Sequence, residues 1–543
     1  MPISQDRRVV SVLSIDSRLR NSTELPKMDF PSGALRFPLQ TFSPQIVGGW
    51  GLLFIALWGV SAVSAADTAR VAALHKAHAA AHQKFAQGVE EVAQLCDATQ
   101  PDVARQIRIL AIPFAEQTVN VDELPRKVQA EDPPGLPEAE REWRVKLRKL
   151  RADYTNELYL LSRRAIQENQ ASLAYRLIRE VAFQSPDDPR ARTALGYKRV
   201  KDEWTTPFAA EMKQKGKIWH RRFGWIAEKD IPKYEAGQRL YNGQWITAEK
   251  EALLRSRFDN GWRIPTEHFL IRTNHSLERG CQMAEAVEVF HAYFKREFAA
   301  FFSTSLQIGK LMDGQRGEAP PDLYEIHYFR TREEFVERLG KKNPSAGKIN
   351  GIYIPTDRVA YFFHNPDASE EATLETLYHE VTHQLLGESA RKWVPVGTER
   401  DFWIVEGIAC YLESFHQAED GTITVGDPEH PRILSARQMI TVDQSYEPLA
   451  RYALMGQVRY QQGELSTLQS RYAQATGLTH FFMHANNQQY RDGLIEYLTR
   501  IYSPNQRIRT NPLSIEQILG VPAATLDKEY ADYMQNLKTS GTP

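Results

Sequence analysis

The sequence predicts an α+β fold in which a small mixed sheet lies between two helix-rich regions. Short runs of β-branched and aromatic residues between positions 267 and 363 have the composition of strands. Before and after them, apolar residues recur at steps of three and four, which is the spacing of one helix face. The chain of 543 residues is long enough for roughly two to four domains.

Residues 1–66 are expected to form a leader. The run from Ile46 to Ala66 carries no charge, has a strongly apolar centre and ends in the small residues after which exporting peptidases cut. It therefore predicts a cleaved signal peptide and an exported protein, whether periplasmic, extracellular or on the cell surface. The alternative is an uncleaved membrane anchor, because about 20 apolar residues can span a bilayer.

Residues 67–195 are predicted to form a helical domain. Good helix formers dominate its first stretch, and Leu158, Leu161 and Ala165 lie on one helical stripe further along. The segment 173–197 resembles one tetratricopeptide-like unit, a repeat that normally needs several copies to bury a core. Two interpretations stay open: a small helical domain leaning on its neighbour, or a peptide-binding repeat.

A short repeat distinguishes the next part, residues 196–262. A glycine followed by a tryptophan occurs from Gly196 to Trp204 and again from Gly237 to Trp245. Glycine turns followed by aromatic residues predict small β-hairpins. The tryptophans either pack a small core or bind a sugar, and packing is the commoner role.

The remaining residues, 263–543, contain the predicted sheet and the helices around it. Four strands are expected, and a long helix at 277–302 follows the first of them. The strand segments are Glu267–Thr273, Leu323–Phe329, Ile352–Ile354 and Val359–Phe363. After position 406 the pattern is mainly helical, with glycine and proline breaks near 421–431 and 503–512.

The chemistry is concentrated in the helix expected after the last strand. It contains His379, Glu380 and His383 in the pattern H-E-x-x-H. Side chains four residues apart share a helix face, so both imidazoles can bind one metal ion, and imidazole is a good zinc ligand. Glu380 lies beside the first ligand, where it can take a proton from a metal-activated water. A capping box of Asp367 and Glu370 is expected to begin this helix.

A second motif supplies a third ligand. Glu406 follows His383 after a gap that lets one helix end and a second helix bring a carboxylate back. A catalytic zinc site needs three protein ligands and an open position. The segment from Trp403 to Glu413 reads W-x-x-E-G-x-A-x-Y-x-E. Together the two motifs resemble the gluzincin metallopeptidases, in which the glutamate of the E-G pair binds zinc. Over about residues 263–540 the chain is similar to a bacterial family of exported gluzincin-like proteins without assigned substrates.

The resemblance implies a zincin-like catalytic domain at residues 263–543, with a small mixed sheet, an active-site helix and then a helical subdomain. His379, His383 and Glu406 would hold one Zn²⁺ per chain, and Glu380 would be the general base. By analogy with that fold, a strand close to the metal helix lies along the cleft. If Val359–Phe363 is that strand, it would bind an extended substrate by β-augmentation.

The resemblance also implies a group that stabilises the oxyanion. In related aminopeptidases a tyrosine of a Y-x-x-G-like segment stabilises the oxyanion, and Tyr472 begins a looser version of that segment. Tyr446, Tyr452 and His480 are alternatives, and Tyr472 could instead be an ordinary core aromatic. Glu413, about two helical turns beyond the third ligand, either supports the metal site from outside or is exposed to solvent.

The leading interpretation is an exported zinc metallopeptidase acting on a peptide or protein substrate. The alternatives are a non-catalytic zinc-containing binding or scaffold protein, and a zinc amidase acting on cell-wall material. A formal net charge of −1 without a dominant basic block gives no sign of a nucleic-acid partner. Membrane contact is expected only if the leader stays uncleaved. Three cysteines do not make a disulfide framework, although Cys96 and Cys281 could form one bridge in an oxidising compartment.

Overall fold

The computed structural model describes residues 65–114, 124–129, 132–315, 322–343, 346–389 and 395–539. The chain divides into two compact units, Met1–Ser64 and Ala65–Pro543, so every described residue belongs to the second unit. Residues 1–64 of the predicted leader lie outside the described residues. In the part of the chain that is described, none of the helices is both long enough and apolar enough to cross a membrane.

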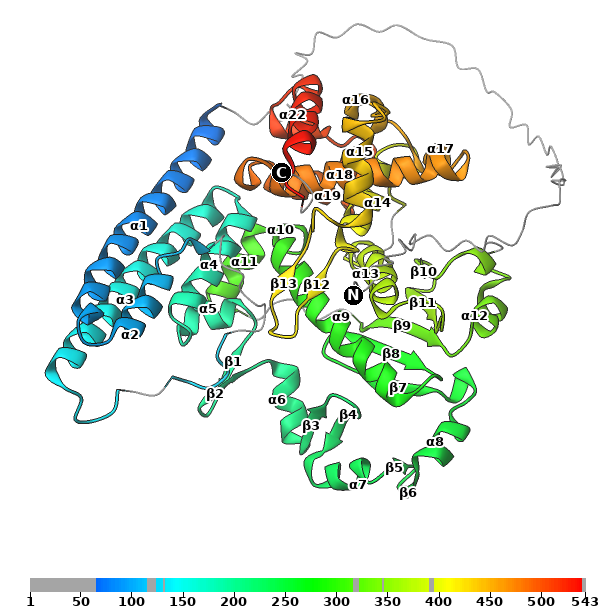
Figure 1. Ribbon diagram of the computed structural model, residues 1–543, viewed down its shortest axis with the longest axis horizontal. Helices are drawn as coiled ribbons and strands as arrows, with labels where there is room; N and C mark the ends of the chain where they lie inside the picture. The colour runs from blue at the N-terminus through cyan, green and yellow to red at the C-terminus, as the bar shows by residue number, and fades with distance from the viewer. Residues whose placement is uncertain are drawn as a thin grey trace, which may run out of the picture. The chain divides into compact units, whose positions relative to one another are not determined.

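The first described region is helical, as predicted. Its helices are α1 (Ala65–Asp97), α2 (Pro101–Ile109), α3 (Glu138–Gln167), α4 (Ala171–Gln184) and α5 (Pro189–Ala194). In Figure 1, α3 lies beside both α1 and α4. The predicted stripe of Leu158, Leu161 and Ala165 is buried in their shared core. A later helix, α11 (Ser305–Met312), adds Ile308 and Met312 to this core.

The predicted hairpins are confirmed, and a third one lies between them. The hairpins are β1–β2 (Lys198–Val200, Glu203–Thr205), β3–β4 (Lys217–His220, Gly224–Ala227) and β5–β6 (Gln238–Tyr241, Gln244–Thr247). Helices follow them: α6 (Pro207–Gln214), η2 (Glu228–Asp230) with α7 (Ile231–Glu235), and α8 (Ala248–Leu254) with η3 (Phe258–Asn260). The middle hairpin also runs from a glycine, Gly216, to a tryptophan, Trp225. Its loop is one residue longer than those of the other two hairpins, so its glycine and tryptophan are one residue further apart. For this reason the repeat pattern in the sequence does not include the middle hairpin.

The central sheet has the strand order β10-β11-β9-β8-β7. Its strands are β7 (Trp262–Pro265), β8 (Phe269–Thr273), β9 (Tyr324–Phe329), β10 (Gly351–Ile354) and β11 (Val359–Phe363). The three inner strands are parallel, and the edge strands β7 and β10 run antiparallel to their neighbours. All four predicted strands are confirmed to within two residues at each end, whereas β7 was not predicted. The protein is therefore α+β, as expected.

The prediction that Val359–Phe363 offers a free edge to a substrate is wrong. This strand, β11, pairs with β10 on one side and β9 on the other, which uses its backbone groups in the sheet. All its residues are buried, as is typical of an interior strand. The edge strands of the sheet are β10 and β7, and β10 lies against α13 (Glu370–Gly387) in Figure 1.

The start of α13 also differs from the prediction. Ser369, rather than Asp367, caps the helix, because its hydroxyl accepts the backbone N–H of Ala372 at 3.1 Å. Ser369 directly precedes the first helical residue in extended backbone, whereas Asp367 lies two residues further out. Before α13 lie α9 (Leu277–Glu297), α10 (Ala299–Phe302), α12 (Arg332–Leu339) and η4 (Ala346–Lys348), so the helix expected at 277–302 is interrupted at Phe298.

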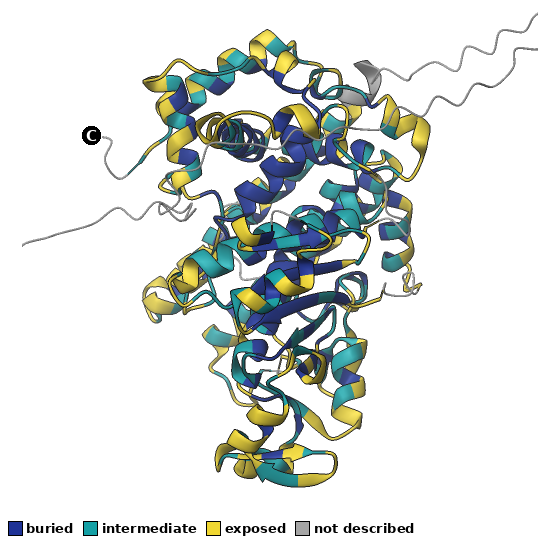
Figure 2. Ribbon diagram, turned by 90° about the vertical axis from the view of Figure 1, so that its right-hand side faces the viewer, coloured by how far each residue is buried: buried dark blue, intermediate teal, exposed yellow. Residues whose placement is uncertain are grey.

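The region after α13 is mainly helical. Its elements are α14 (Phe402–Leu412), β12 (His416–Gln417), β13 (Ile423–Thr424), α15 (Pro431–Thr441), α16 (Leu449–Tyr452), α17 (Gln457–Tyr460), α18 (Leu465–Gln488), α19 (Arg491–Ile501), α20 (Gln506–Thr510), α21 (Ile515–Leu519) and α22 (Ala523–Asn536). Every residue of α14 is buried, because α13, α17 and α18 all pack against this helix. Figure 2 shows the same concentration of buried residues in the strands and inner helices. One apolar core thus joins the sheet, α13, α14 and the later helices.

The glycine of the E-G pair has a packing role. A Cβ atom at Gly407 would lie 2.6 Å from Thr479 Oγ1 and 2.8 Å from the Ala475 carbonyl oxygen, both on α18. Only a residue without a side chain lets α14 and α18 approach this closely.

We therefore expect Gly407→Ala to destabilise the fold. Overpacking a close helix contact costs about 1–3 kcal/mol, which outweighs the gain of up to about 1 kcal/mol from replacing a helical glycine by alanine. Thermal unfolding would measure the loss. Gly347→Ala is the matched control, because a Cβ there meets nothing within 4 Å. Equal stability of the two variants would contradict the packing role.

The cysteines do not form the bridge considered above. Cys96, Cys281 and Cys410 are free and buried. Cys96 belongs to the core of the N-terminal helices and Cys281 to the main core, so the two side chains lie in separate clusters.

Candidate metal centre

The two histidines of the H-E-x-x-H motif point to one spot on α13. Their Nε2 atoms lie 3.2 Å apart, as side chains on successive turns of one helix face can. Both imidazoles are largely buried, with 15% and 17% of the side-chain surface of His379 and His383 exposed.

Glu406 completes a triangle from the neighbouring helix. Its Oε2 atom lies 3.6 Å from Nε2 of His379 and 3.6 Å from Nε2 of His383. Ligands bound to a tetrahedral zinc ion at about 2.0–2.1 Å lie about 3.3–3.5 Å from one another. The three atoms therefore have the chemistry and nearly the spacing of three zinc ligands.

Burial would by itself raise the pKa of the Glu406 carboxyl. The nearby His383 and His379 side chains outweigh it and hold that pKa well below its usual range. Glu406 is thus a carboxylate at neutral pH, the form that binds a cation.

Glu413 holds the first histidine in the orientation that a metal needs. Its Oε1 atom lies 2.7 Å from Nδ1 of His379. Because a carboxylate only accepts, Nδ1 carries a proton, and Nε2 is the nitrogen that faces the other two possible ligands. Arg432, on α15, donates to both oxygens of Glu413 at 2.5 and 3.0 Å. Burial would raise the pKa of the Glu413 carboxyl, but Arg432 lowers it to about 2. Of the two alternatives for Glu413, the structure shows contact with His379 rather than exposure to solvent.

Glu380 is fixed by the edge strand. The backbone N–H of Tyr353, on β10, donates to its Oε2 atom at 2.8 Å. Glu380 is only partly buried, which leaves room for the carboxylate to meet a solvent molecule or substrate. Neither Tyr353 nor Arg432 could be predicted from a sequence motif. Tyr353 acts through its backbone N–H, and Arg432 lies on a helix outside both motifs.

Tyr472 lies near the ligand triangle. Burial raises the pKa of its phenol, and the nearby Glu406 carboxylate raises it further, so the hydroxyl stays protonated and can donate. Its ring packs edge-on against Tyr460 at a centroid distance of 5.5 Å, and the Arg432 guanidinium lies 5.7 Å from its ring centroid. Tyr502, which sequence reasoning missed, also has a pKa raised by burial and then by Glu406.

The three alternatives to Tyr472 are engaged elsewhere. The Tyr446 hydroxyl donates to Asp527, and the Tyr452 hydroxyl donates to the carbonyl oxygen of Arg471, each at 2.5 Å. His480 bonds through one ring nitrogen to the carbonyl oxygen of Gly426 and through the other to a tyrosine hydroxyl. The Tyr472 hydroxyl is also hydrogen-bonded, to Gln461, but of the four groups it is the one whose pKa responds to Glu406.

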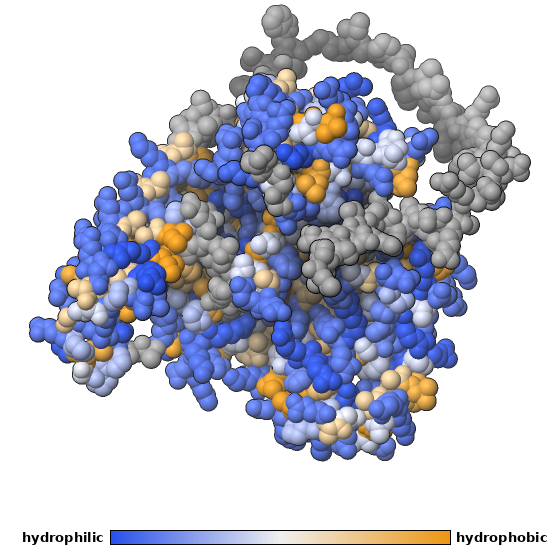
Figure 3. Space-filling model, in the orientation of Figure 1, coloured by the Kyte–Doolittle hydropathy of each residue, from blue (hydrophilic) through white to orange (hydrophobic). Residues whose placement is uncertain are grey.

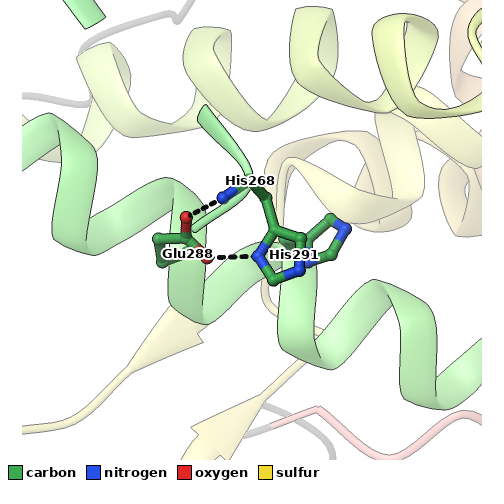
Figure 4. A group of neighbouring side chains, drawn as sticks. All are labelled: His268, Glu288 and His291. Atoms are coloured by element: carbon green, nitrogen blue, oxygen red, sulfur yellow. Dashed lines mark hydrogen bonds and ion pairs between the residues drawn. The ribbon is translucent and has the colours of Figure 1, made fainter. Parts of the chain in front are cut away.

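A second group of potential ligands is less compact. His268, Glu288 and His291 come together where α9 meets the start of β8 (Figure 4). Both oxygens of Glu288 are bonded to His268, one to its backbone N–H and one to its Nδ1 atom, each at 2.8 Å. The rings of the two histidines have centroids 4.0 Å apart and are tilted by 31°. The hydrogen bonds are those of a carboxylate–histidine pair, so His268 and Glu288 satisfy each other without an ion.

The surface adds little to this assignment. On the face drawn in Figure 3, hydrophobic residues are scattered among hydrophilic ones, which is normal for a folded protein.

Comparisons of the chain with known protein families, with curated proteins and with solved structures found no match.

Proposed function

We propose that this chain is an exported zinc-dependent metallopeptidase that hydrolyses peptide bonds. The observation that carries the proposal is the triangle of two imidazole nitrogens and one carboxylate oxygen, with sides of 3.2, 3.6 and 3.6 Å. Two nitrogens and one oxygen are a common ligand set of catalytic zinc, and three protein ligands leave a fourth position open.

The roles of the residues follow from their positions. His379, His383 and Glu406 would hold the ion, and Glu413 would orient His379. A bound zinc ion would polarise the scissile carbonyl and lower the pKa of water. Glu380 would take the proton from the attacking water at its carboxylate and later deliver it to the leaving amine. Tyr472 would donate a hydrogen bond to the oxyanion.

The architecture is compatible with a zincin-like domain at residues 263–543. It has a small mixed sheet, the helix α13 with two ligands, and then a helical part that contributes the third. An extended peptide would pair with the edge strand β10, next to Glu380. The helical region at residues 67–195, with its single tetratricopeptide-like unit, and the hairpin module at 196–262 would precede the catalytic domain.

The first test is the metal content of the purified protein. We expect about one zinc ion per chain in the wild type and none at stoichiometric level in His383→Ala, because three-ligand zinc sites do not survive the loss of one imidazole. His416→Ala is the matched control, since His416 is exposed on β12, outside the ligand triangle. Full zinc in both His383→Ala and Glu406→Ala would contradict the assignment.

Proteomic cleavage profiling would separate the proposal from its alternatives. New peptide termini that depend on zinc support a peptidase. Release of cell-wall fragments alone would favour the amidase, and zinc without any hydrolysis would favour the binding or scaffold protein.

Export makes a separate prediction. The uncharged run that ends at Ala66 should be removed, so the mature protein from its native host should begin near Ala66 or Asp67. N-terminal sequencing would show this, whereas an intact N-terminus in the membrane fraction would favour the anchor.

A further inference from the structure

A small cavity away from the metal centre is lined by four arginines. It has a volume of about 300 Å³ and lies where α4, α9, β13 and the end of α18 meet. Arg176 and Arg179 come from α4, Arg296 from α9 and Arg491 from the start of α19. None of the three proposed zinc ligands lines it.

The positive charge of this arginine cavity exceeds the negative charge around it. Glu297 is the one carboxylate among the described lining residues, and it is bonded to both Arg296 and Arg491. Burial would raise the pKa of Glu297, but these arginines lower it to about 2. Outside the lining, Asp492 pairs with Arg176 at 3.2 Å. Two carboxylates are thus set against four guanidinium groups. Burial lowers the pKa of Arg179 to about 9, so all four are charged at neutral pH.

The histidine of the lining, His484, does not change this balance. Burial, with smaller contributions from His480 and Arg491, lowers the pKa of His484 to about 3. Its Nε2 atom is bonded to the Tyr411 hydroxyl at 2.8 Å, so the ring is neutral at pH 7.

Two donors of the arginine cavity have no acceptor. Arg179 forms no hydrogen bond or ion pair with the described residues, and its guanidinium only lies over the Phe114 ring, 5.2 Å from the centroid. The Nε atom of Arg491 is buried and likewise has no hydrogen-bond partner in the described chain. Arg179 is partly buried, and a charge that is partly removed from water is normally paired, because leaving it unpaired costs free energy.

We propose that the arginine cavity binds a phosphate-type dianion, either inorganic phosphate or the phosphate group of a small phosphomonoester. Guanidinium groups recognise phosphate through two parallel N–H···O bonds, and Arg179 is free to make such a pair. The volume of about 300 Å³ accommodates a phosphate group. Arg179 and Arg296 also line a larger neighbouring cavity, into which the rest of a small ester could extend. The bound dianion would bridge α4 of the helical region to α9 and α19 of the region that bears the metal centre.

The test is phosphate binding by the full-length chain, measured by calorimetry and by thermal unfolding at constant ionic strength. Inorganic phosphate should bind and raise the melting temperature of the wild type. Arg179→Gln should weaken binding about tenfold or more, since one charge-assisted bidentate contact is lost. Because Arg179 has no partner in the described chain, this variant should fold normally without phosphate. Arg179→Lys keeps the positive charge but lacks the planar guanidinium group that makes two parallel hydrogen bonds, so it should bind phosphate with intermediate affinity.

Two controls locate the binding. Arg221→Gln removes an arginine of the neighbouring cavity that is 88% exposed, and it should bind like the wild type. His383→Ala, which lacks a proposed zinc ligand, should also retain phosphate binding, so this result is independent of the proposed peptidase activity.

Each outcome decides the proposal. Tighter binding of glycerol 3-phosphate than of inorganic phosphate identifies a phosphomonoester as the ligand, and the reverse identifies the free ion. The proposal is overturned if the wild type binds neither compound, if Arg179→Gln binds as well as the wild type, or if His383→Ala loses the binding.

Discussion

Glu380→Gln is expected to abolish nearly all turnover while leaving the zinc content at about one per chain. Loss of a positioned general base typically costs about 10²–10⁴-fold in rate. The amide has nearly the same shape as the carboxylate, and its oxygen can still accept the backbone N–H of Tyr353. The variant should therefore fold, keep the three zinc ligands and differ only in its ability to take a proton.

The measurement is the rate of cleavage of a peptide found by the profiling described above, together with metal analysis of the same sample. Glu371→Gln is the matched control, because it makes the same change at an exposed position in the first turn of α13. If Glu380→Gln cleaved at more than about a tenth of the wild-type rate, well short of the loss expected for a general base, another group would have to be the base.

Tyr472→Phe is expected to lower turnover by on the order of 100-fold or more, the usual cost of losing one oxyanion donor. The hydroxyl is protonated at neutral pH, because burial and the Glu406 carboxylate both raise its pKa. The ring contact with Tyr460 does not need the hydroxyl, so zinc content and stability should change little.

Tyr446→Phe is the control for this prediction. Its hydroxyl bonds to Asp527 rather than facing the ligand triangle, so its loss should affect stability more than turnover. Turnover of Tyr472→Phe within about a factor of two of the wild type, far from the expected loss, would remove Tyr472 from the mechanism. The same substitution at Tyr502 would then be the next to test, since Glu406 influences that phenol as well.

The sequence by itself determined the local parts of this protein. Apolar residues alternate along a strand and recur about every 3.6 residues along a helix. Both patterns depend only on residues close together in the sequence, so they located the strands of the sheet and the helices beside them. The pair His379 and His383 needed only the geometry of one helix. The first and last hairpins were equally visible, because a glycine turn and a following tryptophan lie within one short segment.

Tertiary structure decided which of these parts meet. The order of strands made β10 an edge strand and β11 an interior strand, and this order depends on pairings between distant segments. The approach of Arg432 to Glu413 and of Tyr353 to Glu380 depends on how α15 and β10 pack against α13 and α14. The four arginines of the cavity are likewise spread over three helices. Such contacts leave no periodic trace, because the energy that brings distant side chains together comes from burying the shared core rather than from local propensity.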